Sequence, residues 1–288
     1  MNWFAGLKTK KLSVAWEYTT KGNLWRLLPS GSGHIVIEDR DIQQKSVSFA
    51  CLDYATGNVL WKDVQLSEKW WITIEAIHRD VLFLHEYVSP DMPEHKKIFA
   101  VDINTGRTRW SNPDMKFFFA HEDSVYAAKV EYEQRRFYEI DLRNGAVLQE
   151  VDDQYLGVLR ETVTTNSQQH VDFPRAVNSE YAEDELLKIS VQKATAKKNN
   201  ISFVEYLNLK DYYIFGYYEN MSFNPSQQMF RQYLTIVEKE NGKMHFNDIV
   251  NNNVVMAVPD TFFGMGSYVY YVKNKNTLRA INLSTNEE

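Results

Sequence analysis

The chain has 288 residues, of which 44% are hydrophobic and 14% aromatic, and its formal net charge is −6. This length allows one domain or two small ones, and the many aromatic residues are typical of a β-rich fold with a well-buried core. The acidic balance, without a lysine- or arginine-rich stripe, argues against nucleic acid as a partner, because phosphate contacts supply most of that affinity.

The sequence also argues against a membrane-spanning protein and against a disulfide-stabilised one. No segment approaches the roughly 18 uninterrupted apolar residues of a membrane span, and the first residues lack a signal-peptide pattern. We therefore expect no membrane contact and a cytoplasmic location. The single cysteine, Cys51, cannot form an internal disulfide, and its mostly apolar surroundings in the sequence predict an inert buried thiol.

After a lead-in at residues 1–11, alternating or largely apolar runs of four to eight residues predict strands in groups of four. One separate strand is expected at residues 12–18. The next three groups are expected at 24–28, 34–38, 46–53 and 58–62, at 70–77, 81–88, 97–103 and 107–110, and at 116–120, 124–131, 136–142 and 146–151.

Residues 153–200 break this pattern. Residues 155–164 are interpreted as a strand, and residues 179–198 as a helix that Ser179 caps. Acidic residues crowd the start of the predicted helix and lysines its end, which complements the helix dipole. A strand through residues 187–191 is the alternative there. Further strands are expected at 201–207, 212–219, 230–238, 243–250, 253–258, 267–273 and 277–283.

One short pattern recurs at the end of each of the first three groups. An aspartate can accept hydrogen bonds from backbone N–H groups a few residues on, and a glycine can take the positive φ of a strand-reversing turn. A large ring beyond the turn would pack against a neighbouring repeat. The copies place the aspartate four residues before the glycine, and the ring position four after it: Asp53, Gly57 and Trp61; Asp102, Gly106 and Trp110; Asp141, Gly145 and Gln149.

Weaker copies extend the repeat to the end of the chain. Glu238 and Gly242 occupy the acidic and glycine positions of one, with Phe246 as its ring, and Asn282 and Asn286 occupy those of the last. The glycine-equivalent positions are 49, 39, 97 and 44 residues apart, so the long interval contains a hidden or replaced unit. Periods of about 40 to 50 residues are typical of four-stranded propeller blades.

These observations predict an all-β fold, a β-propeller of four-stranded blades in a single domain spanning residues 1–288. Six blades are preferred, and five with an insertion are the alternative. Residues 153–200 form an irregular blade or an insertion that carries the helix near 179–198. Residues 12–18 complete the last blade, because that blade otherwise lacks its final strand and an open edge would remain.

The pattern D-x-x-T-G-x-x-x-W, complete at residues 53–61 and 102–110 and without its tryptophan at 141–149, resembles the blade motif of PQQ-like (quinoprotein-type) β-propeller repeats. The resemblance implies the fold rather than the cofactor, since many members are non-enzymatic scaffolds. The second half of the chain is also similar to an uncharacterised bacterial group of such propellers, which implies no known activity.

No catalytic, cofactor or metal residue is predicted. Quinoprotein dehydrogenases hold their cofactor with an adjacent cysteine pair, which a chain with one cysteine cannot supply. The seven histidines show no recognised metal spacing, and neither G-x-S-x-G nor a phosphate-binding loop occurs. Four aromatic residues in the expected innermost strands are candidates for lining a central channel, with packing between blades as the alternative: Trp70, Trp71, Phe117 and Phe118.

The sequence favours a non-enzymatic scaffold that binds an unknown protein or small-molecule ligand through loops at one face. The alternative is a hydrolase- or lyase-type enzyme that uses carboxylate or histidine chemistry in the central channel. A third hypothesis is a sensor domain whose helix at 179–198 docks a partner.

Overall fold

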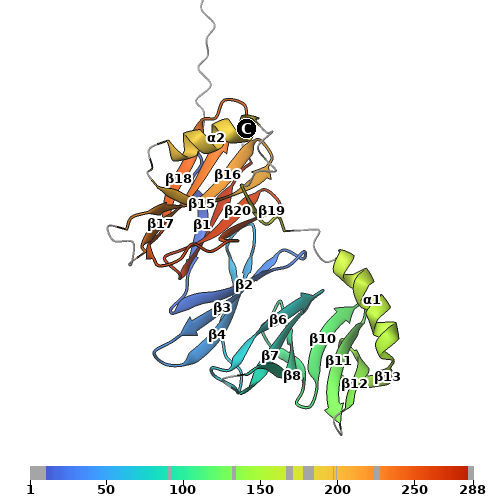
Figure 1. Cartoon of the computed structure of the whole chain (residues 1–288). Coiled ribbons are helices and arrows are strands. Elements are labelled where there is room, and N and C mark those ends of the chain that lie inside the picture. Colours follow the sequence, from blue (N-terminus) through green and yellow to red (C-terminus); the bar gives the residue numbers. More distant parts are fainter. Residues whose placement is uncertain are drawn as a thin grey trace, which may run out of the picture. The chain divides into compact units, whose positions relative to one another are not determined.

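The computed structural model describes residues 11–89, 92–131, 134–166, 171–177, 185–196, 198, 200–222 and 228–284. Their fold is all-β and of the β-propeller type, built from antiparallel meanders that follow one another along the chain (Figure 1). The chain divides into two compact units. We call Thr20–His170 the N-unit, and Met1–Thr19 with Val171–Glu288 the C-unit.

The described part of the N-unit contains three four-stranded sheets, in each of which every strand pairs with the next one in the sequence. The first sheet is β2 (Asn23–Pro29), β3 (His34–Asp41), β4 (Ser46–Asp53) and β5 (Val59–Val64). The second is β6 (Ile72–His78), β7 (Val81–Ser89), β8 (Met92–Asp102) and β9 (Thr108–Asn112). The third is β10 (Lys116–His121), β11 (Ser124–Glu131), β12 (Gln134–Asp141) and β13 (Val147–Val151).

The described part of the C-unit contains two sheets. The fourth sheet of the chain is β14 (Arg175–Ala176), β15 (Ile201–Leu209), β16 (Tyr212–Asn220), β17 (Phe230–Glu238) and β18 (Met244–Val254). The fifth has the order β1-β21-β20-β19, from β1 (Val14–Thr19), β19 (Phe262–Met265), β20 (Tyr268–Lys273) and β21 (Thr277–Asn282). A strand that precedes the N-unit in sequence therefore supplies the outer strand of the last sheet, with Trp16 opposite Ala280.

The predicted fold class is confirmed, but six blades are not. Among the described residues there are five sheets, and residues 153–200 contribute only the two-residue strand β14 to any of them. The rest of that segment's described structure is two helices, α1 (Asp153–Asn166) and α2 (Glu185–Thr195). The number of blades therefore stays a prediction.

The predicted strand at residues 155–164 is wrong, because α1 occupies this segment. Asp152 caps the helix: its Oδ1 accepts a hydrogen bond of 2.8 Å from the backbone N–H of Gln154. Leu156 and Leu159 recur at helical spacing and pack against the third sheet. The β-branched residues near the end of α1 favoured the strand interpretation, and packing on the sheet outweighs that local preference.

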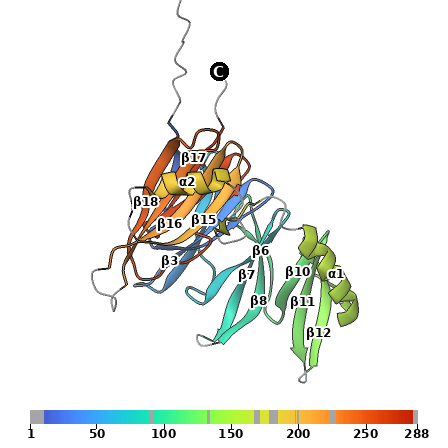
Figure 2. The ribbon, with the colours of Figure 1, turned by 45° about the horizontal axis from the view of Figure 1, so that its top comes forward.

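The predicted helix at 179–198 is confirmed in its described part as α2, which ends at Thr195. Its buried residues include Leu187 and Ala194, which pack against aromatic side chains of β16 and β17. Figure 2 shows α2 lying across the strands of the fourth sheet. The predicted cap, Ser179, lies outside the described residues.

Each helix covers one face of a sheet within its own unit. In the N-unit, one apolar core joins the first and second sheets and another joins the second and third, while α1 covers the remaining face of the third. In the C-unit, one core joins the two sheets and α2 covers the other face of the fourth. Each helix therefore shields an apolar sheet face of its own unit from solvent. The long interval of the repeat contains this pair of covering helices.

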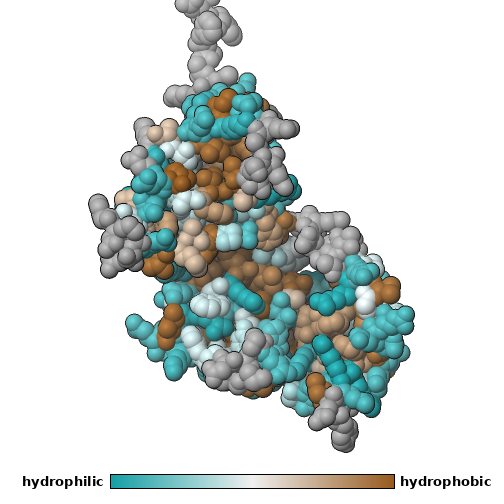
Figure 3. Space-filling model, in the orientation of Figure 1, coloured by the Kyte–Doolittle hydropathy of each residue, from teal (hydrophilic) through white to brown (hydrophobic). Residues whose placement is uncertain are grey.

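None of the described helices combines the length and apolarity of a membrane span. On the face seen in Figure 3, teal polar side chains alternate with brown apolar ones, some of which are exposed below α2. Exposed apolar side chains of this kind are candidates for contact with a partner.

Candidate functional site

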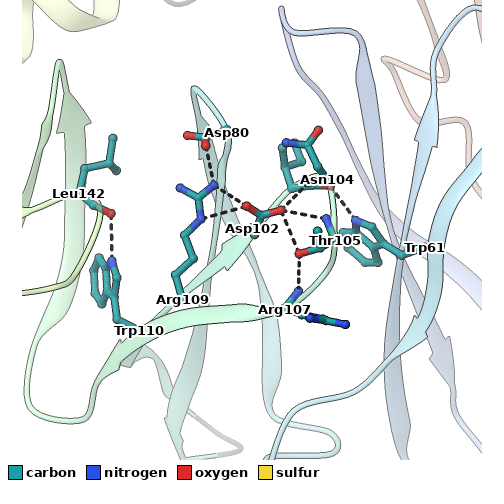
Figure 4. Close-up of polar contacts among 10 residues, drawn as sticks. Trp61, Asp80, Asp102, Asn104, Thr105, Arg107, Arg109, Trp110 and Leu142 are labelled. Carbon is teal, nitrogen blue, oxygen red and sulfur yellow. Dashed lines mark hydrogen bonds and ion pairs between the residues drawn. The ribbon is translucent and has the colours of Figure 1, made fainter.

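The turn between β8 and β9 shows what the repeated aspartate does. Oδ1 of Asp102 accepts hydrogen bonds from the backbone N–H of Asn104 (3.1 Å) and of Thr105 (2.9 Å) and from the Thr105 hydroxyl (3.0 Å). Its Oδ2 accepts from Nε of Arg109 at 3.1 Å, and Arg109 also pairs with Asp80 (Figure 4). Burial raises the pKa of Asp102, but these hydrogen bonds and the guanidinium outweigh it and leave that pKa below its ordinary value.

The tryptophans of the repeat connect neighbouring sheets of the N-unit. Trp61 Nε1 donates to the carbonyl of Ile103 at 2.6 Å, beside the turn of the second sheet. Gly106 in that turn has φ of 70°, and a Cβ there would lie 2.8 Å from the Trp61 ring. Glycine is thus required for both conformation and space. Trp110 repeats the arrangement against the third sheet, donating to the Leu142 carbonyl at 2.9 Å (Figure 4).

The other predicted turn residues have the same geometry. Oδ1 of Asp53 and of Asp141 each accept two backbone N–H groups of their turns. Positive φ occurs at the remaining glycines of the motif: Gly57, Gly145 and Gly242.

At the turn of the fourth sheet, a lysine from a helix contacts the glycine. A Cβ at Gly242 would contact the Lys193 side chain of α2, and Lys193 Nζ donates to the carbonyl of Asn241 at 2.7 Å. A helix residue therefore covers this turn in place of a tryptophan from a preceding blade. Gln149, at the tryptophan position of the third copy, is exposed, and its side-chain amide donates to Glu139 Oε2 at 2.7 Å.

The four aromatic candidates for a channel are all partly buried. Trp70 packs against the core between the first and second sheets, and Trp71 lies edge-on to it with ring centroids 6.2 Å apart. Phe117 packs on Phe83 at 4.7 Å between centroids, in the core of the second and third sheets. Phe118 joins the cluster beneath α1. These contacts are packing between layers, and the lining of a channel stays a prediction.

A buried charge pair joins the first two sheets and was not apparent in the sequence. Glu38 is fully buried and accepts from Arg40 Nε at 2.6 Å, from the Thr73 hydroxyl at 2.5 Å and from the Ile74 N–H at 3.1 Å. Arg40 donates in turn to the carbonyl of Ile72 at 2.8 Å. Because both charges have partners, the pair acts as a structural link between β3 and β6.

An ionic network joins β18 to the fifth sheet in the C-unit. Asp248 accepts from the Tyr271 hydroxyl (2.8 Å), Lys273 Nζ (2.6 Å) and Arg279 Nη1 (2.9 Å). Arg279 Nε also donates to Glu17 of β1 at 2.9 Å. Burial raises the pKa of Asp248, but the hydrogen bonds and the two cationic neighbours outweigh it and place that pKa below its usual range.

The second sheet brings together one carboxylate and two imidazoles. Glu75, His85 and His95 come from β6, β7 and β8, and one ligand atom of each lies within 4.8 Å of the other two. The two imidazole rings stack, with centroids 3.4 Å apart and planes 16° apart. Glu75 Oε2 contacts His85 Nδ1 and lies 3.0 Å from His95 Nδ1. We call these three residues the Glu-His-His group.

The three side chains of the Glu-His-His group differ in their exposure to solvent. His85 is 1% exposed, whereas His95 is more than a third exposed. Burial and the adjacent His85 lower the pKa of His95. Burial raises the pKa of Glu75, but the two imidazoles and the nearby Arg26 outweigh it and leave that pKa below its ordinary value. Glu75 also lines a pocket of about 480 Å³ with the turn at Pro29–Ser32.

No metal residue was predicted from the sequence, because the convergence of these three side chains depends on how strands β6, β7 and β8 pair. Thr73 pairs with His85 and Tyr87 with His95, and the pairing shifts by one residue beside Glu75 and again beside His85. Such β-bulges place the three side chains together although ten residues separate each one from the next. A bulge is set by the pairing of strands, so no local pattern could have revealed it.

An exposed apolar loop follows β18 in the C-unit. The sequence VVMAV at residues 254–258 includes Val255 and Met256, which are 78% and 62% exposed. The loop is attached from beneath: the Tyr218 hydroxyl donates to the Val258 carbonyl at 3.1 Å, and buried Glu205 accepts the N–H of Asp260 at 2.9 Å. Glu205 also accepts the Thr261 hydroxyl at 2.6 Å. We call residues 254–258 the apolar loop.

Comparison with known proteins gives a partial family match and distant structural neighbours. The family model described as "Domain of unknown function (DUF4905)" matches residues 28–110. No curated protein matches the chain. BamB from Moraxella catarrhalis is similar to it at 11% identity and a TM-score of 0.31, covering 96% of this chain and 99% of BamB.

Two further solved structures resemble the chain at a similar level. The Dos1 propeller has 9% identity and a TM-score of 0.30, covering 91% of this chain and 68% of that one. BBS1N, solved in complex with ARL6DN, has 6% identity and a TM-score of 0.34, covering 96% and 98%. Because these TM-scores lie below 0.5, the fold is assigned from the sheets and interlocking turns of this chain.

Proposed function

We propose that this protein is a non-enzymatic β-propeller-type scaffold that binds another protein through the apolar loop at residues 254–258. The observation that supports this proposal is a run of five consecutive apolar residues that starts at the end of β18. Val255, Met256 and Val258 of this run are exposed, and hydrogen bonds from buried side chains hold the backbone nearby. Soluble proteins seldom leave such surface uncovered, and contiguous apolar patches mark interaction sites.

The attachment of the loop suits recognition. Tyr218 and Glu205 are both at most 2% exposed, so the groups that hold the loop belong to the core of the fourth sheet. A loop already fixed in place loses little conformational entropy when a partner binds. Val255 and Met256 then supply the apolar contact area, and the adaptable thioether of methionine suits a protein surface.

The test is affinity capture with the full chain and a double variant, Val255→Asp with Met256→Asp. We expect the full chain to retain a protein in fixed stoichiometry, and the double variant to lose at least about 10-fold in affinity, because a central charge in an apolar interface is left unpaired. Ile42→Asp is the matched control, since Ile42 is 56% exposed in the N-unit and lies outside the apolar loop.

Two results would contradict the proposal. Capture by the double variant at the strength of the full chain would show that the loop is not the contact surface. Equal loss in the Ile42→Asp variant would show that capture follows general surface apolarity. Circular dichroism of each variant shows whether the fold is retained, and only folded variants enter the comparison.

We also propose that the repeats of this chain are of the PQQ-like type. It is supported by the two complete D-x-x-T-G-x-x-x-W copies and by the contact of each tryptophan with the turn of the following sheet. A small-molecule ligand, a cytoplasmic location and the alternative of a hydrolase- or lyase-type enzyme in a central channel stay predictions. Turnover of a substrate, abolished by one substitution in the channel, would favour the enzyme.

A further inference from the structure

We propose that the Glu-His-His group, Glu75, His85 and His95, binds one divalent transition-metal ion of the zinc type. In the described part of the chain, this is the one group in which three carboxylate or imidazole ligand atoms all lie within 4.8 Å of one another. The proposal does not depend on the apolar loop, which belongs to the other unit.

The ligand types select the class of metal. Imidazole nitrogen and carboxylate oxygen are ligands that Zn²⁺ and its first-row neighbours accept, whereas Mg²⁺ and Ca²⁺ prefer all-oxygen sets. Two histidines and one glutamate provide three protein ligands. A tetrahedral ion bound by three protein ligands keeps a fourth position for water or another small ligand.

Unsatisfied polar atoms point to the same conclusion. Nε2 of buried His85 has no partner, while Glu75 Oε2 and His85 Nδ1 contact each other without hydrogen-bond geometry. A buried polar atom without a partner costs about 1–3 kcal/mol, and native proteins contain few of them. A metal ion bound between Glu75 Oε2 and His85 Nδ1 would replace their close contact with two metal bonds.

Binding of a shared ion requires the rings to move apart. The imidazoles of His85 and His95 are stacked with centroids 3.4 Å apart, whereas two imidazoles bound through nitrogen to one tetrahedral ion point away from it in different directions. Because the rings are nearly parallel, one of them must turn to direct its lone pair at the ion. His95 is the more exposed of the two and has room to turn.

The residues around the Glu-His-His group limit its affinity for a metal ion. Glu75, His85 and His95 stand on three adjacent paired strands, which fixes the spacing of their backbones. Against this, Arg26 donates to the Ile74 carbonyl at 2.6 Å and brings a positive charge next to Glu75. His85 Nε2 also lacks the carbonyl or carboxylate partner that usually orients a metal-bound histidine. We therefore expect a weaker site than in dedicated zinc enzymes.

The experiment titrates the full chain with Zn²⁺ alone after treatment with a chelator and desalting, and follows binding by calorimetry. A parallel titration with Co²⁺ reports the coordination geometry through its visible absorption. We expect one equivalent to bind in a low-symmetry, four-coordinate site, and excess Mg²⁺ not to compete. Glu75→Gln and His95→Gln should each lower the affinity at least about 10-fold, since even loss of a supporting partner costs that much.

His121→Gln is the matched control, because His121 is a partly exposed histidine of the N-unit that lies 4.0 Å from one carboxylate, Glu122. It should bind Zn²⁺ as the full chain does. His85 is buried, so a His85 variant that fails to fold would not decide the question; the more exposed His95 carries the test. Absence of Zn²⁺ binding would overturn the proposal. Equal loss of affinity in His121→Gln would also overturn it, because it would indicate adventitious surface binding only.

Discussion

At the scale of residues, the glycine of the turn between β8 and β9 meets two requirements at once. Gly106 has positive φ, and its α-carbon faces the Trp61 ring so closely that a Cβ would overlap it. The spacing of aspartate and glycine in the sequence predicted such a turn, since both roles are local. The neighbour that fills the space could not be predicted in the same way, because it comes from another sheet or, at Gly242, from a helix.

We predict that Gly106→Val destabilises the protein by at least about 2 kcal/mol, since a β-branched residue resists positive φ and meets the Trp61 ring. Urea unfolding measures the change. Gly157→Ala is the control: a Cβ at this position in α1 has open space, so we expect unchanged or up to about 1 kcal/mol greater stability. Equal midpoints for Gly106→Val and the unsubstituted chain would make the turn assignment wrong.

Asp248 gives the stability of the protein a dependence on pH. Its folded-state pKa lies below the unfolded value of about 3.9. Its ionised form therefore contributes stability that is present above that value and is lost as the pH falls through the folded pKa. We predict that Asp248→Asn costs about 1–3 kcal/mol at pH 7, and that the difference between variant and unsubstituted chain narrows as the pH falls below about 4.

Urea unfolding at a series of pH values tests this prediction. The exposed Asp114 supplies the control substitution, Asp114→Asn, which should leave the free energy of unfolding nearly unchanged at pH 7. A constant difference for Asp248→Asn from pH 7 down to pH 3 would show that ionisation of this carboxylate does not stabilise the folded state.

At the scale of elements, the strands of the meanders could be predicted because alternation and turn residues are local signals. The covering helix α1 could not, because its identity depends on the sheet face that it buries. Its apolar residues Leu156 and Leu159 have helical spacing, but the run of β-branched residues beyond them suggested a strand. The Glu-His-His group was missed for a related reason, since two register shifts between strands assemble it.

We predict that Leu156→Ala destabilises the protein by about 2–5 kcal/mol, because Leu156 is fully buried between α1 and the third sheet. Val158 lies on the same helix and is 67% exposed, so Val158→Ala should change stability by no more than about 0.5 kcal/mol. Chemical denaturation compares the two. Similar small effects of both substitutions would mean that α1 does not cover the sheet.

At the scale of the whole molecule, the first described strand belongs with the last sheet. β1 pairs with β21, and Glu17 of β1 bonds to Arg279 of β21, while the N-unit lies between them in the sequence. The missing final strand at the end of the last repeat was the signal for this arrangement. The number of blades was harder to predict from the sequence. The long interval in the repeat indicated a hidden unit, whereas the described structure has two covering helices there.

We predict that deletion of residues 1–19 weakens the fifth sheet, because β21 then has an unpaired edge. Hydrogen exchange resolved by peptide should show faster exchange in β21 and β20. The control region is β7, which lies inside the second sheet of the N-unit and should exchange as before. Unchanged protection of β21 in the truncated protein would contradict this role of β1.

The central claim, that the apolar loop contacts a protein partner, is tested most directly by site-specific photo-crosslinking in the full chain. A photo-reactive residue is placed at Met256 of the loop and, as control, at Ile42, which is similarly exposed in the N-unit. We predict a single major adduct from position 256 and none of that mass from position 42. No adduct from position 256, or the same adducts from both positions, would contradict the claim.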